Sequence, residues 1–201
     1  MKNRKHAQTQ PSPVPVALLL IDVITTFNFP DGDAVLAGGL GIQKSLVALK
    51  AKARELSIPV LYVNDNFGDW RSEKEILLGR CLEAKGGQLI RSLMPDSEDY
   101  FVLKPMHSGF YMTPLEVLLQ HLNVSTLILT GFTSSSCVTC TAHDANMRGY
   151  EIFIPPDCSC ARSPEEHKQS LKQLEAMAGA DLTRSTALRL ESVIESAMRN
   201  T

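Results

Sequence analysis

The chain has almost no excess charge, few aromatic residues and no long hydrophobic run. Its 201 residues contain 20 Lys and Arg against 22 Asp and Glu, a formal net charge of −2, and neither sign is gathered into a block. A nucleic-acid partner requires concentrated positive charge to neutralise phosphates, so we expect none. No stretch approaches the ~18 consecutive apolar residues of a membrane-spanning helix, so we expect no membrane partner either.

A secretory signal is also missing, and the cysteines are odd in number. The apolar segment 14–21 follows a basic start, but it is short, Pro15 and Asp22 bracket it, and no small-residue cleavage site follows. A count of five cysteines does not fit a disulfide framework. We therefore expect a cytoplasmic protein with reduced thiols at Cys81, Cys137, Cys140, Cys158 and Cys160.

Strand-length apolar runs alternate with helical patterns along most of the chain. This alternation is typical of βαβ units and predicts an α/β fold, doubly wound, with a mostly parallel sheet and helices on both faces. The expected strands are 16–21, 59–63, 100–103, 126–130 and 151–154, and the expected helices are 40–56, 115–122, 135–147, 171–177 and 188–198.

Two segments lack such patterns. Residues 1–14 are polar, contain Pro11 and Pro13, and are expected to form a flexible arm in front of a single domain at 15–201. Residues 64–99 form a long connection with Trp70 and several glycines. Long ordered connections often form the walls of functional sites.

Three reactive side chains directly follow predicted strands. Asp22 follows 16–21, Lys104 follows 100–103, and Cys137 lies in the turn after 126–130. Each has an ordinary structural explanation: Asp22 as a turn cap, Lys104 as a solvated strand end, Cys137 as a small buried residue. Because ligands bind outside the carboxyl ends of parallel strands, we expect them to meet there as a base, a cation and a nucleophile.

Cys137 is expected above the N-terminus of a helix. It ends the small-residue run Gly131–Cys137, and a helical pattern follows. Backbone N–H groups and the helix dipole at such a position favour a thiolate and any oxyanion formed beside it. The sequence therefore predicts a thiol nucleophile.

Three ordered motifs resemble the isochorismatase-like cysteine hydrolases. The resemblance rests on Leu18–Asp22, on Leu103–Lys104 with Ser108–Phe110 beyond it, and on Gly131–Val138, and it covers about residues 16–160, including Thr141–Ala145 and Arg148–Tyr150. That family includes nicotinamidases, hydrolases of carbamoyl amides and ureides, and the isochorismatases. It implies the doubly wound fold and places Asp22, Lys104 and Cys137 at the family's catalytic positions.

The resemblance also implies a mechanism. Asp22 would accept the thiol proton, Cys137 would attack a carbonyl carbon, and Lys104 would supply a fixed positive charge. Backbone N–H groups of Thr133 and Cys137 would form the oxyanion hole, beside a cis peptide at Phe132–Thr133. Asp22 would then protonate the leaving nitrogen and activate the water that opens the thioester.

We therefore predict a cysteine hydrolase that cleaves a C–N bond of a small amide, imide or ureide. The resemblance implies a homodimer or homotetramer. For the substrate pocket, we expect Phe27, Asn66, Trp70 and Phe110 as lining residues, with a turn residue and a surface aromatic as the alternative for Asn66 and Trp70.

Some positions depart from the family pattern. Ile24 stands where many members have a glutamine, two residues after the catalytic aspartate. Nicotinamidases bind a metal through an aspartate and two histidines after the second strand, but this chain has no histidine between His6 and His107 and offers only Asp65 there. Zinc and iron sites favour imidazole or thiolate ligands, so we expect neither a metal nor another cofactor.

Other readings of the motifs stay open. An enol-ether hydrolase of the isochorismatase type would use Asp22 as an acid and needs no thiol, and a binding relative would use none of the three side chains. Cys137–Cys140 has the C-x-x-C spacing of redox proteins but lacks the usual spacer residues. His143, six residues after Cys137, falls off its helix face, so no histidine is expected beside the sulfur.

Overall fold

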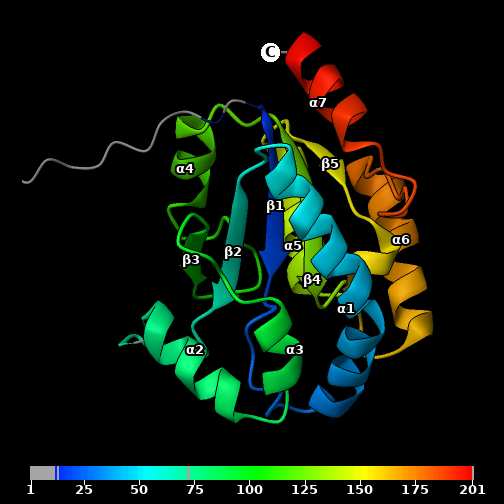
Figure 1. Ribbon diagram of the computed structural model, residues 1–201. Helices are drawn as coiled ribbons and strands as arrows, with labels where there is room; N and C mark the ends of the chain where they lie inside the picture. The colour runs from blue at the N-terminus through cyan, green and yellow to red at the C-terminus, as the bar shows by residue number, and fades with distance from the viewer. Residues whose placement is uncertain (1–11, 13, 72, 201) are drawn as a thin grey trace, which may run out of the picture.

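A parallel sheet forms the centre of the structure, a computed structural model that describes residue 12, residues 14–71 and residues 73–200. Five strands lie in the order β3-β2-β1-β4-β5, and β6 pairs with the end of β4 (Figure 1). All the pairings are parallel. The strands are β1 (Val16–Ile21), β2 (Val60–Asp65), β3 (Tyr100–Lys104), β4 (Thr126–Phe132), β5 (Glu151–Phe153) and β6 (Ser159–Cys160).

Helices cover both faces of this sheet. The first group packs on one face and comprises α1 (Gly32–Glu55), α2 (Lys74–Glu83), α3 (Gly87–Ser92) and α7 (Leu190–Arg199). The opposite face carries α4 (Leu115–His121), α5 (Cys137–Met147) and α6 (Pro164–Ala178), and a short 3-10 helix, η1 (Pro156–Cys158), precedes β6. The predicted doubly wound α/β fold is confirmed.

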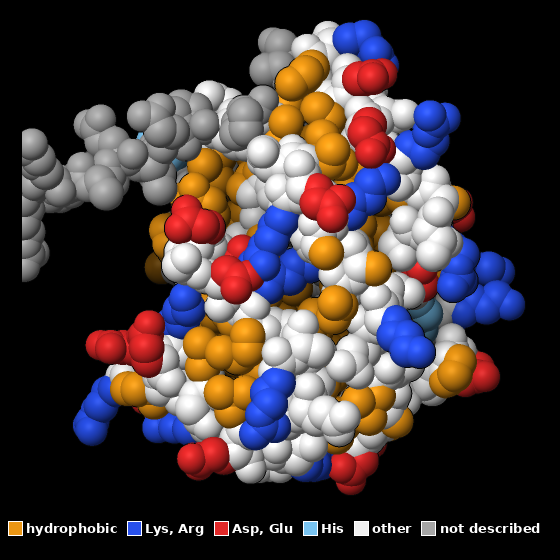
Figure 2. Space-filling view, in the orientation of Figure 1, with side chains coloured by type: hydrophobic (Ala, Val, Ile, Leu, Met, Phe, Trp, Pro, Cys, Tyr) orange, Lys and Arg blue, Asp and Glu red, His pale blue; other side chains and the backbone are white. Residues whose placement is uncertain are grey.

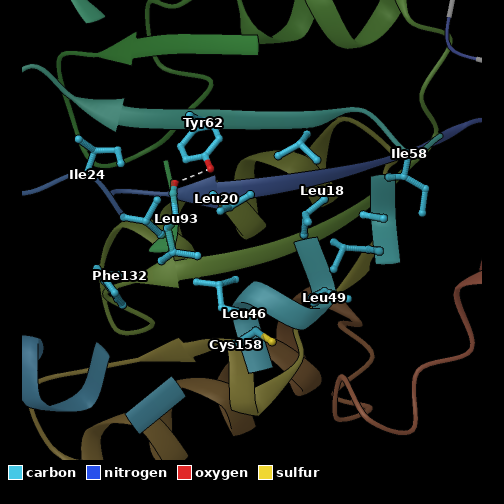
Figure 3. Packing of buried hydrophobic residues seen from close by; sticks show 14 of the residues in the cluster. Leu18, Leu20, Ile24, Leu46, Leu49, Ile58, Tyr62, Leu93, Phe132 and Cys158 are labelled. Atoms are coloured by element: carbon cyan, nitrogen blue, oxygen red, sulfur yellow. Dashed lines mark hydrogen bonds between the residues drawn. The ribbon is translucent and has the colours of Figure 1, made fainter. Parts of the chain in front are cut away.

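Side-chain alternation along β1 builds the two hydrophobic cores. Leu18 and Leu20 face the layer with α1, whereas Leu19 and Ile21 face the layer with α5, and all four are fully buried. Figure 3 shows the first core, in which Tyr62 donates a 2.6 Å hydrogen bond to the Leu93 carbonyl. Burying such a side chain contributes about 1.5–3 kcal/mol, so a strand buried on both faces is a strong anchor for the residue that follows it.

The surface agrees with the balanced composition. Lys and Arg side chains alternate with Asp and Glu over the face shown in Figure 2, with no broad area of one sign. The absence of a nucleic-acid partner stays a prediction.

The predicted elements agree with the structure in kind and order, but α6 starts at Pro164 rather than at the expected residue 171, and there are three further differences. First, α1 starts at Gly32, well before the expected residue 40, and runs through Gly38, Gly39 and Gly41. A Cβ at Gly39 would lie 2.9 Å from side-chain atoms of Leu89 and Phe132, so close packing there requires glycine. Second, the connection 64–99 contains α2 and α3. Third, residues 156–160 form η1 and β6.

Helix α1 corrects one expectation. By length and composition it is apolar enough to cross a membrane, although no such stretch was expected. Its buried residues, among them Val35, Leu46 and Leu49, pack against the sheet, and core helices of globular domains pass the same test. The absence of a membrane partner stays a prediction.

The expected arm lies mostly outside the described residues. Val14, the last residue of this arm, is described. Its side chain is only 8% exposed and belongs to the first hydrophobic core. Val14 therefore packs with the domain, and the division into an arm and a domain stays a prediction.

Candidate active site

Three side chains meet at the carboxyl edge of the sheet. Asp22 follows β1, Lys104 is the last residue of β3, and Cys137 is the first residue of α5, directly beyond β4. The Lys104 Nζ lies 2.9 Å from Asp22 Oδ2 and 3.5 Å from Cys137 Sγ. The structure thus brings together the three reactive side chains selected from the sequence.

The sheet topology explains this meeting. The chain winds outward from β1 through β2 to β3, then returns to the other side of β1 as β4, so β1 and β4 form the switch point of the doubly wound sheet. Ligands bind at such a point in open α/β sheets. Ile21 pairs with Gly131, which places Asp22 beside the turn that leads to Cys137.

Lys104 reaches the site from β3, the strand at one edge of the sheet. Asp65 pairs in register with Lys104 on the neighbouring strand β2, and its Oδ2 forms an ion pair with Lys104 Nζ at 3.4 Å. The Met106 carbonyl accepts a 3.1 Å hydrogen bond from the same Nζ. The lysine is fully buried. A buried ammonium group needs such partners, because an uncompensated charge is very costly to bury.

Asp22 is held in position from two sides. The backbone N–H of Asp65 donates a 2.7 Å hydrogen bond to Oδ1, and Lys104 holds Oδ2. Burial raises the pKa of Asp22, and the charge of Lys104 opposes that rise only in part. The Cys137 thiol also interacts with this carboxyl group and lowers its pKa somewhat. A carboxylate with a raised pKa is a stronger base than one in water.

The surroundings of the Cys137 thiol disfavour its ionisation. Burial raises the pKa of Cys137, the negative charge of Asp22 raises it further, and Lys104 lowers it too little to compensate. Burial lowers the pKa of Lys104, but Asp22 and Cys137 outweigh that effect and raise it overall. Burial and the charge of Asp22 thus oppose ionisation of the Cys137 thiol, while Lys104 is held in its ammonium form.

The turn between β4 and α5 has the expected form. The peptide bond Phe132–Thr133 is cis, as the resemblance implied. Gly131 has a φ of +106°, and a Cβ there would lie 2.1 Å from the Ile21 carbonyl oxygen, so glycine is required. As the first residue of α5, Cys137 presents a backbone N–H that has no acceptor within the helix.

A cavity of about 440 Å³ opens beside the sulfur. One wall is apolar and comes from the loop after β1, α1, the loop after β2 and the end of β4. The polar part of the lining includes Asp22, Asp65, Thr133 and Cys137. The full lining is Asp22, Thr25, Phe29, Pro30, Val35, Asp65, Phe67, His107, Phe132, Thr133, Ser136, Cys137 and Arg162. A small, mostly apolar chamber with few polar groups is typical of a small-molecule site.

The four residues expected to line the pocket lie elsewhere. Phe27 is fully buried in the first core, where its ring packs 5.9 Å from that of Phe132, and Phe110 packs against Tyr150 in the second core. Asn66 and Trp70 flank a separate surface hollow, and Trp70 is 81% exposed. Side-chain direction in a loop has no sequence period, which is why none of the four residues falls in the lining of the cavity beside Cys137.

Several residues that line the cavity were not predicted from the sequence. Phe29 and Phe67 provide the apolar wall in place of Phe27 and Trp70. His107 Nδ1 lies 3.7 Å from Cys137 Sγ, which corrects the expectation that no histidine stands near the sulfur. Its position three residues after Lys104 was a signal that could have identified it. Arg162 reaches the rim from the segment before α6 and pairs with Glu166.

The remaining cysteines lie outside the cavity lining. All five cysteines are free, and Cys81, Cys158 and Cys160 are buried. Cys158 and Cys160 both point inward, although only one was expected to, because η1 breaks the extended alternation. Among residues 12, 14–71 and 73–200, no cluster of three His, Cys, Asp or Glu side chains is placed to hold a metal ion.

Comparison with known proteins identifies the family. A sequence model of the Isochorismatase domain matches residues 16–187. The chain belongs to the isochorismatase family. An uncharacterized isochorismatase family protein of Bacillus subtilis, YaaI, is 36% identical over 167 residues, which cover 83% of this chain and 92% of that protein.

Other isochorismatase relatives extend the comparison. The ureidoacrylate amidohydrolase RutB of Methylobacterium radiotolerans is 28% identical over 195 residues, covering 83% of this chain and 76% of that protein. The crystal structure of an isochorismatase family protein from Desulfovibrio vulgaris superposes with a TM-score of 0.72 at 27% identity, covering 90% of this chain and 99% of that one. Both the sequence and the fold therefore place the chain in this family.

Proposed function

We propose that the protein is a cysteine hydrolase that cleaves a C–N bond of a small amide, imide or ureide through a thioester on Cys137. The observation that carries this proposal is the contact of Cys137 with both Asp22 and Lys104 at the base of a mostly apolar cavity. A nucleophile, a base and a fixed cation within contact are the parts that covalent acyl transfer requires.

The first half of the reaction follows from these contacts. Asp22, a carboxylate of raised pKa, takes the proton of the Cys137 thiol as the sulfur attacks the substrate carbonyl carbon. Lys104 offsets the negative charge that passes from carboxylate to sulfur, because its ammonium lies within 3.5 Å of both. Asp22 then gives its proton to the leaving nitrogen, the C–N bond breaks, and the thioester remains.

The oxyanion of the tetrahedral intermediate would meet backbone donors. Thr133 and Cys137 both line the cavity; Thr133 begins the turn after β4, and Cys137 is the first residue of α5, where the backbone N–H has no acceptor within the helix. Preorganised N–H groups contribute about 2.7–4 kcal/mol to such a transition state. We assign the oxyanion hole to these two groups.

The reaction class is supported by relatives. RutB of Methylobacterium radiotolerans is named for the hydrolysis of ureidoacrylate, a C–N bond cleavage. The competing enol-ether chemistry needs Asp22 as an acid but has no use for a thiol in contact with it. The placement of Cys137 against Asp22 therefore favours amide cleavage.

The test removes the nucleophile. Cys137→Ala should abolish ammonia release from a panel of small amides, imides and ureides, while substrate binding measured by calorimetry is retained. The parent, quenched during turnover of a slow substrate, should carry a mass adduct on the peptide with Cys137. The matched control is Cys140→Ala, which removes a thiol one turn further along α5 and should leave turnover unchanged. Turnover by Cys137→Ala would eliminate the thioester and favour the enol-ether reaction.

A further inference from the structure

His107 is held at the cavity by its two neighbours in the chain. The carbonyl of Met106 accepts a hydrogen bond of 3.1 Å from Lys104 Nζ. On the other side, Ser108 donates a hydrogen bond to Asp144 of α5. The backbone on both sides of His107 is therefore tied to the reaction centre or to the helix that begins with Cys137, although the imidazole itself is exposed.

The imidazole faces the sulfur. Its Nδ1 lies 3.7 Å from Cys137 Sγ and 3.4 Å from Ser136 Oγ, and the residue lines the cavity. A thioester carbonyl carbon is bonded directly to Sγ. A water molecule that approaches that carbon from the cavity therefore comes within hydrogen-bonding reach of Nδ1.

Beside the sulfur, Asp22 is more enclosed than His107. It is 8% exposed, and its two oxygens are engaged by Lys104 Nζ and by the backbone N–H of Asp65. The His107 imidazole, in contrast, is exposed to solvent at the cavity. A general base must reach the proton it removes, and histidine is the side chain that most often does so.

We propose that His107 is the general base that activates the hydrolytic water when the thioester is opened. This assignment rests on the thioester mechanism proposed above, and it leaves Asp22 with the proton of the thiol and of the leaving nitrogen. Catalysis is thereby divided between a buried acid–base group for acylation and an exposed one for deacylation.

The step balances as follows. Water gives a proton to Nδ1 of the neutral imidazole, and its oxygen bonds to the thioester carbonyl carbon. The C–S bond of the tetrahedral intermediate then breaks, its electron pair returns to Sγ, and the imidazolium proton neutralises the sulfur. A thioester and water become a carboxylic acid and the free Cys137 thiol.

The experiment separates the two half-reactions with p-nitrophenyl acetate, an activated ester that acylates thiols. The parent should give a burst of p-nitrophenolate followed by slow turnover, with an acetyl adduct on Cys137. His107→Gln keeps a hydrogen-bonding side chain but removes the base. It should retain the burst and kcat/KM, while kcat and the decay of the adduct fall by about 100-fold or more. His107→Ala should regain deacylation when imidazole is added to the buffer.

The control is His143→Gln, because His143 lies on α5 and does not belong to the described lining of the cavity. It should match the parent. Adduct decay in His107→Gln within threefold of the parent would overturn the assignment, as would equal losses in kcat and kcat/KM. A parent that shows neither burst nor adduct would instead refute the thioester mechanism itself.

Discussion

Lys104 is the residue on which the charge balance of the site depends. It is fully buried, and its ammonium group contacts Asp22, Asp65, Cys137 and the Met106 carbonyl. Lys104→Met keeps the length of the side chain and removes the charge. A positioned charge beside a developing anion is worth about 3–4 kcal/mol, so kcat/KM should fall about 100- to 1,000-fold.

The same variant should still fold. Without the ammonium group, Asp22 avoids a buried unpaired charge by taking up a proton, which removes the base as well. Steady-state kinetics measure the loss, and circular dichroism verifies the fold. Activity within threefold of the parent would show that Lys104 has no part in the reaction.

Single residues were predictable where a strand fixes them. Asp22 and Lys104 follow apolar runs whose direction and register are set by the sheet, and Cys137 follows a turn that needs Gly131. The wall of the cavity was not predictable. It comes from loops after β1 and β2, where the turn of the backbone at residues such as Phe27, with a φ of +58°, decides which ring faces the cavity.

At the scale of elements, α6 supports the turn between β4 and α5 through His167. Its Nε2 donates a 3.0 Å hydrogen bond to the Pro156 carbonyl, so Nδ1 accepts a 2.8 Å hydrogen bond from Ser134 Oγ. Burial lowers the pKa of His167 below its usual 6.5, although the Pro156 carbonyl opposes this. Below that usual value the unfolded chain binds a proton that the folded state resists, so acid should destabilise the fold through this residue.

His167→Gln tests this link. At pH 7.5 the variant should unfold about 1 kcal/mol more easily, because hydrogen bonds at α6 are weakened. Between pH 7.5 and 5.5, its thermal midpoint should fall less than that of the parent. Calorimetric scans across this pH range measure both effects. A parent and a variant with parallel pH dependence would remove His167 as the source.

The helices and strands differ in how well they could be predicted from the sequence. Strands β1, β2 and β4 are β-branched or leucine-rich runs buried on both faces, which the run of apolar residues identifies directly. The first turns of α1 were not predicted, because three glycines lower the helix propensity of that segment. Gly39 is explained only by its close packing against Leu89 and Phe132, which the sequence does not reveal. Helices α2 and α3 are short, so local periodicity carried little information about them.

At the scale of the whole molecule, we predict a metal-independent enzyme. Asp65, the one carboxylate at the position where nicotinamidases bind a metal, already contacts Lys104 and accepts a hydrogen bond from the Phe67 N–H. Zinc and iron favour imidazole or thiolate ligands, which the described residues do not gather there. Turnover should be unchanged after dialysis against a chelator. A stoichiometric transition metal in active protein, measured by plasma mass spectrometry, would contradict this.

The position of β3 has a consequence for how the molecule loses activity. This strand stands at the end of the strand order and is held by β2 alone among the strands, yet it carries the ammonium group that the centre requires. Outer segments of a fold open at a lower free-energy cost than its middle. A partial opening that frees β3 would remove the Lys104 ammonium group from Cys137 and Asp22. A low concentration of denaturant should therefore abolish turnover while most of the far-UV ellipticity is retained. Loss of turnover should therefore detect partial opening of the native state at lower denaturant concentrations than circular dichroism does.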